Sequence, residues 1–118
     1  MGFVLDTLII DEVVTTPTTI NTTTTFDAVD ISKKEDAFSI MLTYDNGSSV
    51  NMTLFVEVSV DGVTFSRIDD ADQTITDDTG SMIWDFNDSG TNYMRVGIEV
   101  TAGSIDVNKV AFSQRRRH

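Results

Sequence analysis

One stretch of the chain constrains its fold more than any other: from Val50 to Val60, apolar side chains occupy every second position. Successive side chains of an extended strand point to opposite faces, so a repeat of two residues indicates a long strand with one buried face. The run ends at Asp61-Gly62, a pair that favours a tight type I′ turn because glycine accepts a positive φ angle. Residues 63–68 should then return antiparallel, which predicts a hairpin over residues 54–68.

The same alternation recurs along most of the chain and predicts further strands. Strand-like apolar patterns cover residues 26–31, 38–44, 82–86, 93–100 and 105–112. Ala102-Gly103 is expected to turn the chain, and the change of apolar phase between Val107 and Val110 indicates a bulge near Asn108-Lys109. No stretch of ten residues carries a helical apolar repeat free of β-branched residues. The sequence therefore predicts an all-β fold, an antiparallel β-sandwich of the jelly-roll or immunoglobulin-like kind, with about seven to eight strands.

The inward phase of the three clearest strands predicts the core. Its expected members are Met52, Leu54, Val56, Val58, Trp84, Met94, Val96, Ile98 and Val100. Trp84 could instead be an exposed platform for a sugar ring, but it shares a face with Met82 and Phe86, which favours the core. On the opposite face, Arg95 is expected to lie over an aromatic ring or to bridge to Glu99 or Asp85 across strands.

The charge of the chain excludes several kinds of partner. With 19 acidic and 8 basic residues in 118, the net charge is −11. Three of the bases are Arg115, Arg116 and Arg117, so the rest of the chain carries 5 bases against 19 acids, a net charge of −14. Nucleic acid and anionic membranes require a basic surface, and we expect neither as a partner. At this length one hydrophobic core, and hence one domain, is expected.

The sequence is poor in the groups that catalysis needs. It has no cysteine, and its one histidine is His118. Catalytic triads and histidine metal centres are therefore not expected, and we predict neither an enzymatic activity nor a cofactor. Five carboxylates fall in one connection and are weak calcium candidates: Asp69, Asp70, Asp72, Asp77 and Asp78. Their spacing does not match an EF-hand loop, so a solvated acidic loop is the favoured interpretation.

The two ends of the chain depart from the strand rhythm. Residues 3–14 hold eight large apolar side chains, and residues 13–25 hold eight threonines around Pro17. We interpret residues 1–24 as an extended N-terminal arm that docks on a neighbouring subunit, or alternatively as a first strand over 7–14. The opening residues contain an acid and no base, so neither a secretion signal nor a membrane anchor is expected there.

These features divide the chain into the arm, a sandwich over residues 25–113 and a basic tail over residues 114–118. The tail is too highly charged to be expected in a sheet. It could contact an acidic neighbour, be a disordered end or be a non-native extension, and the sequence does not choose. The predicted assembly interface comprises Leu5, Leu8, Ile9, Ile10, Val13, Arg115, Arg116 and Arg117.

Four short segments resemble a known group of proteins. They are Val58–Ile68 (VSVDGVTFSRI), Gly80–Trp84 (GSMIW), Tyr93–Val96 (YMRV) and Ala102–Ile105 (AGSI). An S-x-D-G-x-[TN]-[WF] hairpin followed by a Y-[VM]-R-[VL] strand and a glycine-turn strand resembles small β-sandwich proteins of tailed-phage virions. The resemblance covers roughly residues 26–112. It implies a capsid decoration, head-fibre or tail-associated protein that is made in the host cytoplasm, resides in the virion and binds other virion proteins, usually as a homo-oligomer.

Two other functions are compatible with a β-sandwich. One is a carbohydrate-binding or receptor-binding module, in which calcium at the acidic loop would help to bind a glycan. The other is a pilus-like or adhesin subunit, which the absence of a recognisable signal makes less favoured. A glycan-binding module should expose at least two aromatic side chains in one patch, whereas a protein of a repeated surface should expose apolar residues at its arm or flank.

Overall fold

The computed structural model describes residues 6–32, 38–86 and 91–117, with the side chains of residues 9–32, 38–86 and 91–114. Its elements are β1 (Asp6–Val14), β2 (Thr18–Ile20), β3 (Thr24–Thr25), β4 (Val29–Asp30), β5 (Phe38–Ser59), β6 (Ser66–Arg67), the 3-10 helix η1 (Asp69–Ala71), β7 (Gln73–Ile75), β8 (Gly80–Phe86) and β9 (Tyr93–Arg117). In this part of the chain no helix has the length and apolar character needed to cross a membrane.

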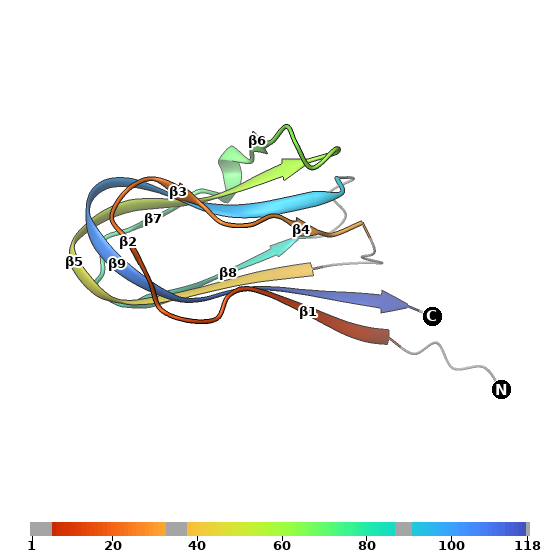
Figure 1. Cartoon of the computed structure of the whole chain (residues 1–118), viewed down its shortest axis with the longest axis horizontal. Coiled ribbons are helices and arrows are strands. Elements are labelled where there is room, and N and C mark those ends of the chain that lie inside the picture. The colour runs from red at the N-terminus through yellow and green to blue at the C-terminus, as the bar shows by residue number, and fades with distance from the viewer. Residues whose placement is uncertain (1–5, 33–37, 87–90, 118) are drawn as a thin grey trace.

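Two very long antiparallel strands, β5 and β9, organise the fold. Their pairing extends from Phe38 opposite Gln114 to Ser59 opposite Tyr93. The ribbon that they form bends in the middle, so that its two halves lie over each other as two layers (Figure 1). All the strand pairs are antiparallel, and the predicted all-β sandwich is confirmed.

The bend coincides with the irregular part of the ribbon. The ladder between β5 and β9 shifts register repeatedly between Asp45 and Met52. Asn46 and Ser49 have positive φ angles of 52° and 53°, and Gly103 on β9 has a φ of 86°. Such residues insert bulges that bend and twist a strand without ending it. One ribbon can therefore supply both layers.

Each layer adds shorter strands to its half of the ribbon. The lower layer in Figure 1 contains, in order, β1, residues 105–117 of β9, residues 38–44 of β5 and β8. The upper layer contains β3 and β4, residues 93–100 of β9, residues 50–59 of β5, and β6 and β7. β2 pairs with β9 near the bend.

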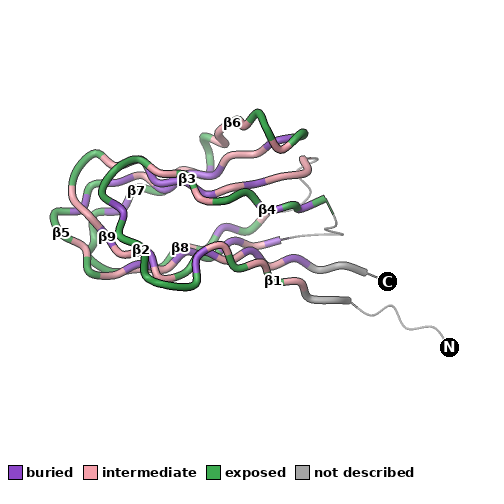
Figure 2. Tube along the Cα trace, viewed as in Figure 1, coloured by how far each residue is buried: buried purple, intermediate pink, exposed green. Residues whose placement is uncertain are grey.

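The hydrophobic core lies between the layers, where buried residues of both meet (Figure 2). It includes the predicted residues Met52, Leu54, Val56, Trp84, Met94, Val96 and Ile98, with Val58 and Val100 partly buried against it. Trp84 is 5% exposed and donates its indole N–H to the carbonyl oxygen of Ala71 at 2.8 Å. The core interpretation of Trp84 is confirmed.

The predicted hairpin forms, but its connection is longer than a two-residue turn. β5 and β6 pair through two residues each, as far as Val58 opposite Ser66, and residues 60–65 connect the two strands. Gly62 has the expected positive φ, 78°. The carboxylate of Asp61 accepts the N–H groups of the two residues after Gly62. The side chain of Asp61 thus builds the loop where we had expected a main-chain type I′ turn.

Two further strand predictions, for Val60 and for Ala102-Gly103, are wrong, and the predicted bulge near Asn108 is confirmed. Val60, assigned to the apolar face, is 68% exposed because β5 ends at Ser59. Ala102-Gly103 does not end a strand, since β9 continues through it. The predicted bulge is confirmed: Val107 and Lys109 pair with consecutive residues of β5, which leaves Asn108 between them.

The N-terminal segment belongs to the chain's own sheet. β1 pairs with β9 from Asp6 opposite Arg117 to Val14 opposite Val110, and β2 and β3 place threonines along β9. The first-strand alternative is therefore what the described residues form, and the favoured arm on a neighbouring subunit is wrong for them. β-branched residues fit an extended strand well, and β1 pairs with the edge of β9 within the same chain.

The basic C-terminus also differs from the expectation. β9 runs through Arg117, whose backbone lies opposite Asp6, so residues 114–117 are not a tail outside the sheet. Strand pairing joins main-chain groups, and a row of charged residues can take part in it at the margin of a layer.

Candidate interaction surface

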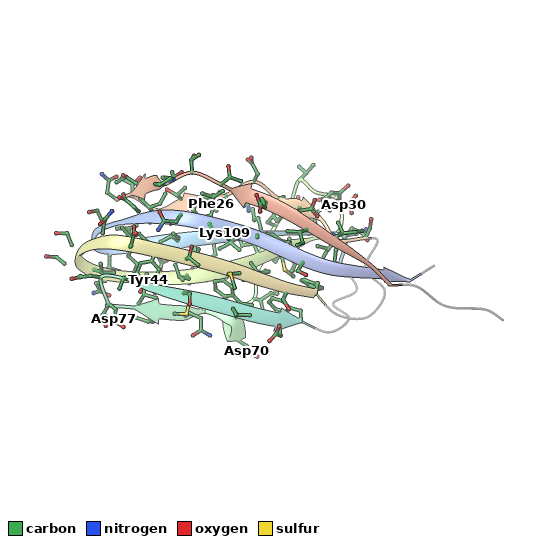
Figure 3. All side chains as sticks on the ribbon, turned by 90° about the horizontal axis from the view of Figure 1, so that it is seen from below. Phe26, Asp30, Tyr44, Asp70, Asp77 and Lys109 are labelled. Atoms are coloured by element: carbon green, nitrogen blue, oxygen red, sulfur yellow. The ribbon has the colours of Figure 1, made fainter. Side chains whose placement is uncertain are left out.

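The outer face of the lower layer exposes apolar residues. Ile10 of β1 is 56% exposed, Met41 of β5 38% and Ile83 of β8 59%. Ala111 of β9 lies among them. We call these four residues the aliphatic stripe. Figure 3 looks at the molecule from this side, with β1, β9, β5 and β8 next to one another.

The stripe is a consequence of strand register. Met41 lies opposite Ala111 on one side and opposite Ile83 on the other, so three strands present an apolar residue in the same row. Their neighbours Ile40 and Trp84 point into the core. Because side chains alternate between faces, both faces of these strands are apolar at this row. The outward side chains line a shallow groove of about 470 Å³.

Two opposite charges flank the groove. Lys109 of β9 and Asp85 of β8 both line it and are both exposed. Lys109, labelled in Figure 3, forms no ion pair with another described residue. The two other basic side chains that the structure describes, Arg67 and Arg95, each bind a carboxylate. Among the three basic side chains that the structure describes, Lys109 is thus the one without an ion pair.

The outer face of the upper layer is covered by its own side chains. Phe55 is 6% exposed, and its ring fills the space over Gly97, where a β-carbon would collide with it. The guanidinium of Arg67 lies 4.4 Å from the centre of the Phe55 ring. That of Arg95 lies 3.9 Å from the centre of the Phe65 ring. Stacking of this kind holds arginine and ring together at a half-buried surface.

Carboxylates complete this cover. Arg95 Nε donates to Glu57 Oε1 at 2.8 Å, on the neighbouring strand. The predicted stacking of Arg95 on a ring is confirmed, whereas the acid that it binds is Glu57 and not Glu99 or Asp85. Arg67 donates to Asp72 at 2.8 Å, and this hydrogen bond is the main cause of a raised pKa of the Arg67 guanidinium. The upper face therefore satisfies its charges internally.

The acidic connection does not gather its carboxylates. The candidate ligands were Asp69, Asp70, Asp72, Asp77 and Asp78. Asp72 is bound to Arg67, while Asp70 and Asp77 lie at separate places along the molecule (Figure 3). Burial, and after it the charges of Asp77 and Asp78, raise the pKa of Tyr44. Across residues 6–32, 38–86 and 91–117, no three acidic or histidine side chains are placed to hold a metal ion.

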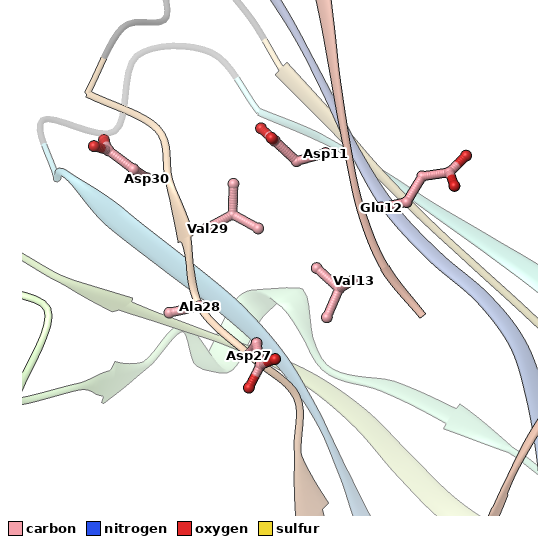
Figure 4. Close-up of a pocket in the computed structure, with 7 residues that line it drawn as sticks. All are labelled: Asp11, Glu12, Val13, Asp27, Ala28, Val29 and Asp30. Atoms are coloured by element: carbon pink, nitrogen blue, oxygen red, sulfur yellow. The ribbon is translucent and has the colours of Figure 1, made fainter. Parts of the chain in front are cut away.

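A second groove opens at the side of the sandwich between β1 and β4 (Figure 4). It is lined by Asp11, Glu12, Val13, Asp27, Ala28, Val29 and Asp30. Two of these residues are joined by Gln114, which is 3% exposed and donates Nε2 to Asp11 Oδ2 and to the carbonyl oxygen of Asp30, both at 3.3 Å. Its Oε1 has no partner among the described residues. These bonds make the groove a polar seam that ties the two layers together.

The structure describes the side chains of three of the predicted assembly residues, and these lie at different depths. Ile10 belongs to the aliphatic stripe, Ile9 is half-buried and Val13 packs against the core. Leu5 lies outside the described residues. For the others the structure describes the backbone: Leu8 lies opposite Arg115, and Arg116 and Arg117 continue the same ladder.

Sequence reasoning missed most of the stripe. The alternation over residues 38–44 and 82–86 puts Met41 and Ile83 on the outward phase of their strands, but it does not show that these two residues are neighbours. The signal was present, since an outward phase that is apolar in two strands is unusual for a solvated face. Which strands are neighbours, and hence that Lys109 and Asp85 flank the same patch, required the structure.

Comparison with known proteins gives a fold but no family. No protein-family model matches the chain, and neither does any curated protein. Among solved structures, the chain is similar to VP2 of infectious bursal disease virus in a subviral particle, with a TM-score of 0.61 and 8% identity. The match covers 94% of this chain and 33% of VP2, so the chain spans about a third of the length of that protein. At this identity the likeness concerns the fold.

A second solved structure is a protein of Bacillus endospore appendages, a novel family of disulfide-linked pili. It aligns with a TM-score of 0.44 and 16% identity over 96% of this chain and 88% of the other. Neither neighbour is a bacteriophage protein, and the resemblance to phage virion proteins stays a hypothesis.

Proposed function

We propose that the chain is a non-enzymatic structural component of a phage virion, which decorates or links the capsid or tail surface through repeated copies of its β-sandwich. In this proposal it is made in the host cytoplasm, resides in the particle and contacts other virion proteins and further copies of itself.

The aliphatic stripe carries the proposal. A protein of a repeated surface needs an apolar flank that a neighbour can cover, and Ile10, Met41 and Ile83 form such a flank. Their exposure is hard to account for in a solitary protein whose opposite outer face is covered by its own arginines and rings.

The fold agrees with this role. The sandwich of this chain is similar to part of VP2, a protein whose structure was solved in a subviral particle. A β-sandwich of this kind provides two packed layers with outer faces on which neighbouring subunits can lie.

A glycan-binding role has less support. The described aromatic side chains are all buried or partly buried: Phe26, Phe38, Tyr44, Phe55, Phe65, Trp84, Phe86, Tyr93 and Phe112. Stacking on a sugar ring needs an exposed aromatic face, so the described surface offers no such platform.

The proposal is tested on particles from cells that express the native gene. Antibodies raised against the recombinant chain are used to follow it through a density gradient of the lysate. We expect the chain to band with the particles, to stay bound through a high-salt wash and to be present in many copies per particle. A chain that remains in the soluble fraction, while the particles form normally without it, would overturn the proposal.

A further inference from the structure

We propose that the aliphatic stripe is a self-association face, on which a second copy of this chain packs its own stripe about a two-fold axis through Met41. The inference rests on the proposed function for its setting, a repeated surface, and names the contact through which copies meet. The contact itself is argued from the register and charges of the lower layer.

The charges on this face are arranged symmetrically about Met41. Lys109 lies opposite Thr43, one strand to one side of β5 and two residues beyond Met41. Asp85 lies opposite Ser39, one strand to the other side and two residues before Met41. Met41 is therefore the midpoint between the two charges.

Lys109 and Asp85 cannot neutralise each other within one copy. The two residues are two strand spacings apart across the sheet and four residues apart along the strands, a separation of about 17 Å. A two-fold axis that lies in the plane of the interface, passes through Met41 and is perpendicular to the line joining the two charges exchanges their positions. Lys109 of each copy then faces Asp85 of the other, and the contact contains two such ion pairs.

This symmetry favours a second copy over an unrelated partner. A closed two-fold contact requires a patch that is complementary to itself, with opposite charges placed equally on either side of a centre. The stripe meets this requirement, with an apolar centre and one charge of each sign at its flanks. A strongly basic partner would be drawn instead to the acidic surfaces elsewhere on a chain of net charge −11. Glu12, opposite Ala111 on β1, lies at the rim, where water can solvate it.

The size of the face indicates how the contact works. Four strands about 4.8 Å apart and about seven residues long give roughly 440 Å² per copy, or about 900 Å² for a pair. Stable interfaces start at about 1,200 Å² in total. An isolated pair should therefore be weak, and the contact gains strength where other contacts hold many copies side by side.

The test uses the full chain and two charge reversals, Lys109→Glu and Asp85→Lys. Self-association is measured by sedimentation equilibrium over a concentration series at low salt. We expect the parent chain to associate weakly and each reversal to weaken association about tenfold or more, because each places like charges together at both ion pairs. An equal mixture of the two variants should associate as the parent does, since every pair in the mixed dimer is again of opposite sign. The double variant should recover for the same reason.

Asp77→Lys is the matched control, because it changes the charge as Asp85→Lys does, at an exposed position that lines neither the groove of the stripe nor the pocket beside Asp85. It should not weaken association. The inference is overturned if the parent does not self-associate, if the single reversals associate like the parent, or if the mixture fails to recover. A chain that is monomeric but still bands with particles refutes this inference alone, whereas a chain that self-associates but is absent from particles refutes the proposed function.

Discussion

The two outer faces of the sandwich use the same strands in opposite ways. On the upper face, the ring of Phe55 covers Gly97, and Arg67 and Arg95 lie over aromatic rings while they bind acids. On the lower face, the aliphatic stripe is bare and Lys109 has no acid within the described part of its own copy.

The difference shows which face of the molecule leaves apolar and charged groups without partners in the same copy. Both faces are supplied by β5 and β9, so strand chemistry alone does not separate them. What separates them is whether apolar and charged groups find partners within the copy. A face that is satisfied internally has nothing to gain from a neighbour, whereas a bare stripe flanked by a lysine without an ion pair gains by being covered.

The largest effect should come from removing the centre of the covered face. Phe55→Ala should lower the free energy of unfolding by about 3–5 kcal/mol, because it removes a buried ring and leaves a void over Gly97. The matched change on the bare face, Ile83→Ala, should cost about 0.5 kcal/mol, since that side chain is 59% exposed. Urea unfolding of both variants measures the contrast. Similar losses at the two positions would show that the faces do not differ as described.

A smaller loss is expected at the loop that leads to Phe65. Gly62 has a φ of 78°, and an added β-carbon would lie 3.2 Å from the Tyr93 ring. Gly62→Val should therefore destabilise the fold by about 1–3 kcal/mol through backbone strain. Thermal unfolding detects a loss of this size. A variant that melts with the parent would mean that the loop can adopt another conformation without strain.

Replacing one arginine or lysine on each face sharpens the comparison further. Arg95→Met removes the bond to Glu57 and the stacking on Phe65, and should cost about 1 kcal/mol, less at high salt. Lys109→Met removes a charge without a partner and should leave the free energy of unfolding of the single copy unchanged. Denaturant titrations at low and high salt provide the measurement, and an equal loss for both would contradict the assignment of Lys109 as unpaired.

Much of the fold followed from alternation. The inward phase of Met52, Leu54 and Val56 and the bulge at Asn108 could both be predicted from apolar residues alone, since a half-buried strand must keep its pleat in register with the core. The continuity of β5 and β9 could not. Residues such as Asn46 and Gly103 are typical of turns, and here they bend a strand that goes on, because the partner strand is irregular at the same place.

The candidate surface was less predictable because it depends on strand neighbours. The sequence places Met41 and Ile83 on outward phases, but their contact arises from the pairing of β8 with the first half of β5, far from the hairpin that anchored the prediction. The N-terminal segment was misjudged for a similar reason. Its composition fits an edge strand and an exchanged arm equally well, and the choice depends on whether β9 has an open edge.

The smallest expected effect concerns the response to acid of the loop that leads to Phe65. Asp61 Oδ1 accepts the N–H groups of Thr64 and Val63 and the hydroxyl of Ser59, and these bonds hold the pKa of Asp61 below its usual 3.8. A carboxyl group with a lowered pKa in the folded state stabilises the fold above its unfolded pKa, and this contribution is lost as the pH falls through the folded value.

Asp61→Asn keeps a hydrogen-bond acceptor but removes the charge, so the variant should be less stable than the parent at neutral pH. The gap should stay constant down to about pH 5 and narrow below pH 3.8 as the parent's carboxylate becomes protonated. In a Ser59→Ala background the Asp61 carboxylate keeps its charge with one donor fewer, so the gap at neutral pH should be smaller and its narrowing should be complete at a higher pH. Denaturation midpoints between pH 7 and pH 2.5 follow both variants, and a gap that is the same at every pH would show that the charge of Asp61 does not stabilise this loop.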